Sequence, residues 1–391
     1  MTQESEKRSI LVTSALPYAN APLHLGHIVE HTQTDIWVRF QRLQGNDCTY
    51  VCADDAHGTP IMLRAEELGI EPEELIEQTY EQHLEIFKKY NISHDNYHTT
   101  HSEENRMLSE KIFNSLQERG LIEIKKINQL FDTSREMFLS DRYVKGICPE
   151  CGAEDQYGDN CEKCSATYNA IDLKSPISVI SGTEPIIKES EHLFFKLSVL
   201  REEIENWLDS SNVQIPVRNK LDEWIKSELK DWDISRDSPY FGFEIPGYEN
   251  KYFYVWLDAP IGYLASHLNF LKKNNAEESF STLWSTDSKM EVFHFIGKDI
   301  MYFHALFFPV MLLNSNFKAP DGVFVHGFLT LNGEKMSKSR GNFISAENYI
   351  NNLNEDYLRY FIASKLGNGV DDIDLNLDEF KQKNNTDLVN K

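Results

Sequence analysis

The chain has 391 residues, of which 41% are hydrophobic and 26% charged, a composition typical of a folded protein with two or three domains. Its formal net charge of −23 argues against broad, non-specific nucleic-acid binding, because an acidic surface repels a phosphate backbone. Contact with RNA is therefore expected to be local. The N-terminus lacks the features of a signal peptide, and no apolar run approaches the length of a membrane span. We expect a cytoplasmic protein with no membrane partner.

Two stretches of the sequence predict strands that alternate with helices. The apolar run 10–16 precedes apolar residues at helical spacing from Ile28 to Leu43, and a second apolar run follows at 48–55. Later, KYFYVWLD predicts a strand that ends at Asp258, the N-cap of a helix with Pro260 in its first turn. VFHFIG and the apolar segment 300–312 repeat this order. Such alternation indicates an α/β fold with a doubly wound parallel sheet.

Residues 121–250 differ in character and predict a domain inserted between two halves of the sheet domain, 1–120 and 251–328. The insertion contains four of the six cysteines, several Gly and Ser turns, and amphipathic helices such as VLREEIENWL. Residues 329–391 begin with a basic loop and end in a helical pattern, whose apolar residues without an evident partner are Leu377, Phe380, Leu388 and Val389. We expect the start of a truncated helical domain there. The alternative is a terminal helix docked on the core.

His24 and His27 flank Leu25 and Gly26 directly after the first predicted strand. If a helix begins near Leu25, both imidazoles lie one turn apart at its N-terminus, at the sheet edge where α/β folds bind ligands. Unpaired N–H groups there attract phosphate, Gly26 allows a nucleotide to approach the main chain, and imidazoles can donate to phosphate oxygens. The pattern indicates a nucleotide site. A packed histidine pair with satisfied hydrogen bonds is the alternative.

Residues 331–341 read LNGEKMSKSRG, in which Asn332 and Gly333 predict a tight turn before three cations, Lys335, Lys338 and Arg340. The chain has no Walker A motif, because GKD at 297–299 lacks the required hydroxyl residue. A basic loop flanked by glycines can close over a triphosphate and stabilise the phosphorus under attack. The alternative is a solvated basic turn.

HLGH at 24–27 and KMSKS at 335–339, separated by an insertion, resemble the paired motifs of class I aminoacyl-tRNA synthetases. PYANAPLHLGH, ADDAHGTP, VWLDAPIGY, FIGKDIMYFH and KMSKSRGNF are similar to the methionyl-tRNA synthetase family in particular, and the resemblance extends over nearly the whole chain. It implies a Rossmann-like nucleotide-binding fold and a methionine–tRNA ligase. The implied catalytic residues are His24, His27, Lys335 and Lys338. The implied ATP-binding residues are Pro17, His24, Gly26, His27, Lys335, Met336, Ser337, Lys338 and Ser339.

A methionine side chain is apolar and ends in a polarizable sulfur, so its pocket needs aromatic walls and a few donors. The resemblance implies that the walls are Ala15, Leu16, Trp256, Ala259, Pro260 and Phe303, with polar atoms from Tyr18, Tyr263 and His304. Asp55 would hold the substrate ammonium. Phe308 stands where this family commonly shows a tryptophan, and we include it as a pocket residue. Taken singly, each aromatic residue would more often belong to the core than to a pocket.

Cys148, Cys151, Cys161 and Cys164 form the pattern C-x2-C-x9-C-x2-C, which predicts one structural zinc ion held by four thiolates. The alternatives are two disulfides, an iron–sulfur cluster or a site without metal. The resemblance likewise implies a zinc knuckle, residues 148–164, within the inserted domain. Cys48 and Cys52 are expected to be buried residues of the second strand.

The implied reaction is activation of L-methionine by ATP, with Mg²⁺, to methionyl-adenylate and pyrophosphate, followed by transfer to the 3′ end of tRNA. Because the helical domain is expected to be truncated, we predict competent adenylate synthesis and weak tRNA charging. One alternative is another class I synthetase, for cysteine, isoleucine or valine, although the insertion is short for an editing domain. The others are a nucleotidylyltransferase of small molecules and an inactive paralogue that binds tRNA.

Overall fold

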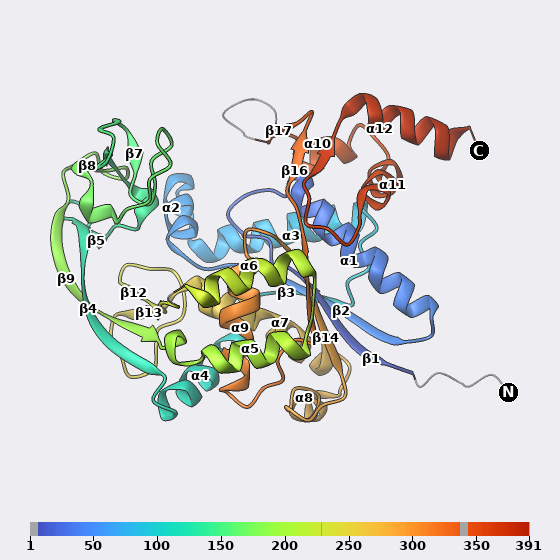
Figure 1. The fold of residues 1–391 in the computed structure, drawn as a ribbon, viewed down its shortest axis with the longest axis horizontal. Helices are drawn as coiled ribbons and strands as arrows, with labels where there is room; N and C mark the ends of the chain where they lie inside the picture. Colours follow the sequence, from blue (N-terminus) through green and yellow to red (C-terminus); the bar gives the residue numbers. More distant parts are fainter. Residues whose placement is uncertain (1–6, 228, 337–342, 391) are drawn as a thin grey trace. The chain divides into compact units, whose positions relative to one another are not determined.

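The computed structural model describes residues 7–227, 229–336 and 343–390. Its largest sheet has six strands in the order β10-β15-β14-β1-β2-β3, and every neighbouring pair is parallel (Figure 1). Their bounds are β1 (Ser9–Ser14), β2 (Asp47–Asp54), β3 (Asn96–Thr99), β10 (Asn212–Val213), β14 (Glu291–Gly297) and β15 (Gly322–His326). The strand order reverses between β1 and β14, and ligands bind at such a switch point in doubly wound folds. The predicted fold class is confirmed.

Helices pack on both faces of this sheet because successive residues of a strand point to opposite sides. On one face, Val38 of α1 (Leu25–Leu43) packs with Ile10, Val12 and Tyr50. On the other, Tyr263 of α7 (Val255–Lys273) lies against His294 of β14, and α7 also contacts α4 (Glu103–Glu118). The prediction that the first helix begins near Leu25 is confirmed.

The prediction for residues 251–260 is wrong in its boundaries. The strand β13 is only Lys251–Phe253, and α7 already begins at Val255, so Asp258 and Pro260 lie inside the helix. The aromatic and branched residues of VWLD have high strand propensity, but burial of Leu257, Pro260 and Ile261 against the sheet overrides that local preference.

Further helices and a small sheet complete the sheet unit. The helices are α2 (Thr59–Leu68), α3 (Pro72–Lys89), α5 (Arg201–Ser210), α6 (Ile215–Lys226), α8 (Phe280–Leu283), α9 (Phe308–Leu313), α10 (Ala346–Ile350), α11 (Glu355–Lys365) and α12 (Leu377–Asn384). A π-helical turn, Phe303–Phe307, leads into α9. A three-stranded sheet contains β16 (Leu329–Leu331), β17 (Glu334–Lys335) and β18 (Ile373–Leu375). No helix in the described ranges is long and apolar enough to cross a membrane.

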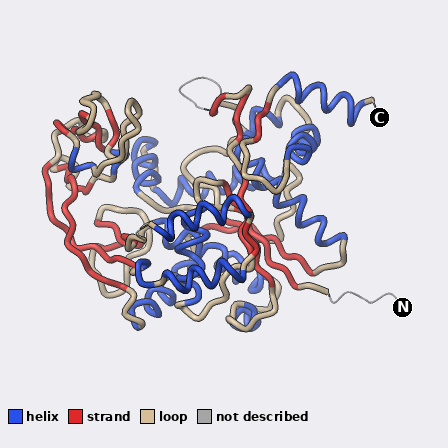
Figure 2. Tube along the Cα trace, in the orientation of Figure 1, coloured by secondary structure: helices blue, strands red, loops and turns tan. Residues whose placement is uncertain are grey.

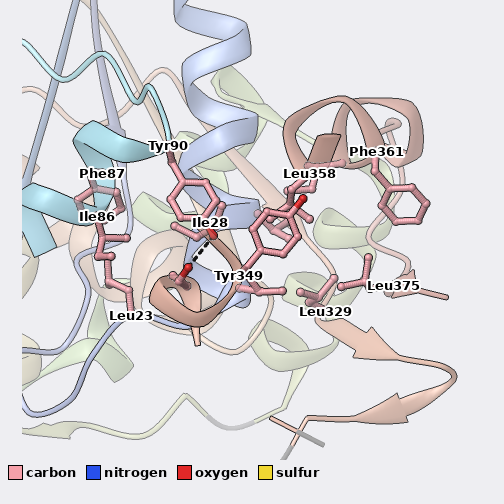
Figure 3. Close-up of a cluster of buried hydrophobic side chains, with 14 of the residues drawn as sticks. Leu23, Ile28, Ile86, Phe87, Tyr90, Leu329, Tyr349, Leu358, Phe361 and Leu375 are labelled. Carbon is pink, nitrogen blue, oxygen red and sulfur yellow. Dashed lines mark hydrogen bonds between the residues drawn. The ribbon is translucent and has the colours of Figure 1, made fainter. Parts of the chain in front are cut away.

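The C-terminal helices share a core with the start of α1. Figure 3 shows Ile28 of α1 beside Tyr90, Tyr349 and Leu358, and the Tyr90 hydroxyl donates to the Ala346 carbonyl at 2.8 Å. Phe380 of α12, which was expected to lack a partner, is 9% exposed and packs in this cluster. The other three residues are exposed, as expected for apolar side chains without a partner: the exposed fraction is 50% for Leu377, 40% for Leu388 and 63% for Val389.

The chain divides into two compact units. The sheet unit comprises Met1–Gly120, Leu197–Lys230 and Val255–Lys391, and the inserted unit comprises Leu121–Lys196 and Asp231–Tyr254. The segment 197–230 was expected in the insertion, yet it packs with the sheet unit. Strand β10 pairs with β15 there, and Trp207 donates its indole N–H to the Pro320 carbonyl at 2.8 Å.

The inserted unit is built on a long antiparallel pair, β4 (Ile122–Asp132) and β9 (Ile186–Phe195), which Figure 2 shows as two adjacent strands. Its other strands are β5 (Met137–Phe138), β6 (Val144–Ile147), β7 (Gln156–Tyr157), β8 (Lys174–Ser178), β11 (Trp232–Asp233), β12 (Ser235–Asp237) and β13. The four cysteines of the predicted knuckle lie between β6 and β8.

Candidate active site

His24 and His27 lie together at the N-terminus of α1, at the carboxyl edge of the sheet. Their rings stack with centroids 3.8 Å apart. The Gly26 N–H donates to Nδ1 of His24 at 3.0 Å, and the His24 N–H donates to Nδ1 of His27 at 3.2 Å. Because each Nδ1 accepts, a neutral ring carries its proton on Nε2. Burial, with the neighbouring His24 and His83, holds the pKa of His27 well below its usual value. Near neutral pH, His27 is therefore an uncharged donor.

The His24 ring lies over the main chain at Gly26. A Cβ placed on Gly26 would lie 2.8 Å from both Cε1 and Nδ1 of His24, closer than side-chain atoms normally approach. A side chain at residue 26 would thus displace the His24 ring. Glycine is required here by packing on the histidine, in addition to any contact with a ligand.

The segment that follows the lysine motif lies directly against this helix start. The Phe343 ring is 5.8 Å from the His24 ring, and His24 forms a β-bridge with Ser345. The Ala346 N–H also donates to the Leu23 carbonyl at 2.9 Å. These two parts of the sequence are more than 300 residues apart, yet they form one structural region.

Lys335 and Met336 are the first two residues of the lysine motif and belong to the described residues. β17 pairs with β16 through a turn in which φ is positive at Asn332 and Gly333, as the sequence predicted. Lys335 is exposed, with Nζ 4.8 Å from the Phe328 ring centroid, and Met336 packs against the cluster of Figure 3. Ser337, Lys338 and Ser339, which were predicted to contact ATP, lie outside the described residues.

Asp55 follows β2 at the same edge of the sheet. Its N–H donates to the Pro17 carbonyl at 2.8 Å, which ties it to the segment after β1. Burial, together with the nearby Asp258 carboxylate, raises the pKa of Asp55 well above its usual value. Its buried Oδ1 has no hydrogen-bond partner among the described residues. Such a carboxylate would be stabilised by a cationic ligand.

The predicted aromatic pocket residues come from α7 and from the turn that precedes α9. The rings of Trp256 and Phe303 are 4.1 Å apart, and the Tyr263 hydroxyl donates to Nε2 of His304 at 2.8 Å. His304 Nδ1 in turn donates to the Ile300 carbonyl at 3.1 Å, and burial lowers the pKa of His304 to about 4. The histidine is therefore a neutral acceptor for Tyr263.

The segment after β1 lies beside these aromatic residues. Leu16 lies against α7, where its Cδ1 is 3.1 Å from the position that a Cβ would take on Gly262, and Ala15 donates its N–H to the Phe295 carbonyl at 3.0 Å. The Tyr18 hydroxyl donates to the His57 carbonyl at 2.9 Å. The remaining predicted residues are a partly exposed Ala259, a buried Pro260, and Phe308, which is 1% exposed and lies behind Tyr263.

Sequence reasoning missed two buried polar groups of the sheet unit, and the first lies at the switch point. Glu30 of α1 is 8% exposed, and its Oε2 lies 3.3 Å from Nε2 of His326, the last residue of β15. Burial raises the pKa of Glu30, although His326 and the Gly297 backbone oppose that shift. The available signal was spacing, because Glu30 is three residues beyond His27 and shares its helix face.

A second missed group supports the segment that precedes His24. His83 of α3 is 1% exposed, with Nδ1 2.7 Å from the Asp54 carboxylate and Nε2 3.1 Å from the Ala21 carbonyl. Tyr97 donates a further hydrogen bond to Asp54. These contacts fix the path of the chain between β1 and α1.

In the inserted unit, the four predicted cysteines form one cluster, with all four sulfur atoms within 4.8 Å of one another. Sγ of Cys148 is 3.9 Å from Sγ of Cys164, and Sγ of Cys151 is 3.6 Å from Sγ of Cys161. Four thiolates at about 2.3 Å from one zinc ion would be separated by about 3.8 Å. These spacings are much too long for disulfide bonds. The cluster could hold a zinc ion.

The fold and the paired motifs define a nucleotide-binding enzyme of the class I aminoacyl-tRNA synthetases, and comparison with known proteins agrees. Residues 10–391 match the family described as tRNA synthetases class I (M), so the chain belongs to this family of ligases. The resemblance noted in the sequence is confirmed.

Two similar solved structures are Mycobacterium tuberculosis methionyl-tRNA synthetase in complex with methionyl-adenylate, at 26% identity, and a crystal structure of the same enzyme bound by methionyl-adenylate, at 25%. The TM-score is 0.77 for each. Each match covers 98% of this chain and 69% of the other.

Proposed function

We propose that this synthetase is specific for L-methionine, which it activates with ATP and transfers to the 3′ end of tRNA. The observation that carries the proposal is the contact of the His24 region with residues 343–346, which adjoin the lysine motif, at the sheet edge that also holds Asp55. The methionyl-adenylate bound by the two Mycobacterium tuberculosis structures supports methionine as the substrate.

At the ATP end of the site, we assign His24 and His27 to the α-phosphate. Because each Nδ1 accepts a hydrogen bond, the proton of each neutral ring is on Nε2, and we assign this N–H to donate to phosphate oxygens on which negative charge develops. Lys335 and Lys338 would bind the β- and γ-phosphates. Gly26, Pro17, Met336, Ser337 and Ser339 would line the same nucleotide site.

At the amino-acid end, Asp55 would receive the ammonium group, because its buried carboxylate has an unsatisfied oxygen. Trp256 and Phe303 would contact the side chain, with the Tyr263–His304 pair at its polar end. The other proposed lining residues are Ala15, Leu16, Tyr18, Ala259, Pro260 and Phe308. The pocket would select an unbranched, polarizable side chain through aromatic contacts.

The reaction requires no nucleophile from the protein. A carboxylate oxygen of methionine attacks the α-phosphorus of ATP, the bond to the β-phosphate bridging oxygen breaks, and pyrophosphate leaves with Mg²⁺. The ribose hydroxyl at the 3′ end of tRNA then attacks the activated carbonyl and releases AMP. The protein contributes positioning and charge stabilisation. A cytoplasmic location, where ATP and tRNA are available, is part of this proposal.

Zinc in the knuckle would act structurally. Cys148, Cys151, Cys161 and Cys164 would supply all four ligands, which leaves no position for a reactive water molecule. Replacing Cys148 and Cys151 with serine should remove that zinc from the purified protein. Equal zinc content in this variant and the wild type, measured by elemental analysis, would contradict the assignment.

The proposed specificity is tested by ATP–pyrophosphate exchange with separate amino acids. We expect exchange that depends on methionine and is much weaker with cysteine, isoleucine and valine. A preference for one of those amino acids would show that it is the substrate and that methionine is not. Exchange with none of them, from a folded protein, would favour a paralogue that only binds tRNA.

A further inference from the structure

A second group of metal-ligating side chains lies within the sheet unit, apart from the knuckle. His31 of α1, Cys52 of β2 and His94, which precedes β3, each place one ligand atom within 4.8 Å of the others. His31 and Cys52 are fully buried, and His94 is partly exposed. The proposed methionine and ATP assignments use none of these three residues.

The Cys52 thiol donates to the Ser14 carbonyl at 3.5 Å, and Oγ of Ser14 lies 2.8 Å from the Tyr50 hydroxyl, but hydrogen bonding within the protein does not satisfy His31. Nδ1 of His31 has three close polar neighbours: Nε2 of His94 at 3.1 Å, Oγ of Ser14 at 3.2 Å and the Tyr50 hydroxyl at 3.3 Å. A neutral Nδ1 offers one proton or one lone pair, so it cannot bond well to all three. Nε2 of the same ring is buried without a hydrogen-bond partner among the described residues. Several ligand atoms thus converge on one point of the interior.

From this convergence we propose that His31, Cys52 and His94 bind one zinc ion, with Oγ of Ser14 completing four-fold coordination. The thiolate and two imidazoles are ligands that Zn²⁺ accepts readily, and tetrahedral coordination separates such atoms by about 3.3–3.8 Å. Ser14 Oγ lies 3.6 Å from Sγ of Cys52 and 3.2 Å from Nδ1 of His31, close to those values. The ion takes the place of the competing hydrogen bonds.

The surrounding charges favour a cation. Glu30 directly precedes His31 in α1 and Asp54 lies two residues beyond Cys52 in β2, and both carboxylates are at most 8% exposed. Asp35 is already paired with Arg39 and Arg359.

The ion would fasten α1 to the sheet one turn beyond the catalytic histidines. His31 is four residues beyond His27, while Ser14 and Cys52 belong to β1 and β2. Bonds from one ion to these elements and to His94 would fix the position of the helix that presents His27. The role is structural, since Ser14, His31 and Cys52 are inaccessible to a substrate.

Zinc content of the full chain tests the proposal, with matched controls within the same protein. Cys52→Ala and His94→Asn should each lose one zinc equivalent relative to the wild type. Cys48→Ala, which changes another buried thiol of β2, and His98→Asn, which changes a histidine bonded to Glu104, should lose none. Unchanged zinc in both Cys52→Ala and His94→Asn would overturn the proposal.

Cobalt substitution provides a readout that does not depend on the knuckle. In a background with Cys148→Ser and Cys151→Ser, added Co²⁺ should give a thiolate charge-transfer band that disappears with Cys52→Ala. If that variant does not fold, His94→Asn, which changes a partly exposed ligand, should alter the band and replaces Cys52→Ala in this test. A spectrum of hexaaqua Co²⁺ in the folded background would show that the cluster is only a hydrogen-bond network.

Discussion

Gly26→Ala separates the proposed catalytic role of the histidine pair from the stability of the fold. The new Cβ would lie 2.8 Å from two atoms of the His24 ring, so the ring must rotate away. Loss of the hydrogen bond from the Gly26 N–H to His24 costs about 0.5–2 kcal/mol of helix capping. Alanine recovers about 1 kcal/mol of helix propensity at this position. We expect the free energy of unfolding to change by no more than about 1 kcal/mol.

Adenylate formation should respond far more strongly than stability. Removing one donor to a developing negative charge commonly slows a reaction by about 10²–10³-fold, and His24 stacks on His27. We therefore expect methionine-dependent ATP–pyrophosphate exchange to fall on the order of 100-fold. Gly367→Ala is the control, because no heavy atom lies within 4 Å of its added Cβ. A Gly26→Ala variant that exchanges at the wild-type rate would refute the assignment of His24 to the reacting phosphate.

Three further predictions concern Asp55, Lys338 and His192. Asp55→Asn should raise the KM for methionine about 10- to 100-fold, because it removes a charged hydrogen bond worth about 1.5–3 kcal/mol. An unchanged KM in exchange assays would exclude the contact between Asp55 and the substrate ammonium. Lys338→Ala should slow pyrophosphate release in single-turnover experiments while methionine affinity is retained; a wild-type rate would remove this lysine from the mechanism. In the inserted unit, burial lowers the pKa of His192, but Asp233 at 2.7 Å and Asp237 at 3.0 Å raise it overall. The stabilisation from charged His192 is complete below its unfolded pKa near 6.5, and it is lost as the pH rises through the higher folded pKa. In denaturant titrations at several pH values, His192→Gln should therefore reduce the change in the free energy of unfolding over this pH range. An identical profile would contradict the ion pairs.

Local sequence patterns were sufficient to predict much of the secondary structure of the sheet unit. The start of α1 at Leu25 and the turn at Asn332 and Gly333 follow from residue preferences within a few positions. The parallel order of the sheet likewise follows from alternating strands and helices. These features depend on short-range physics, which the sequence displays directly.

Features that depend on contacts between residues distant in the chain could not be predicted from the sequence. Glu30 and His326 are 296 positions apart, and only the folded sheet brings their side chains together. The two-residue strand β10 is too short for a periodic pattern, so the return of residues 197–230 to the sheet unit could not be predicted. At Val255 local strand propensity was misleading, because tertiary burial decided the helix boundary.

The central claim is that the two motif segments hold opposite ends of one ATP molecule. A crystal structure of the full chain with a non-hydrolysable ATP analogue and methioninol tests it most directly. We predict that the α-phosphate lies within hydrogen-bond distance of Nε2 of His24 or His27, with the terminal phosphates at Lys335 and Lys338. An analogue bound with its phosphates away from either motif would contradict the account.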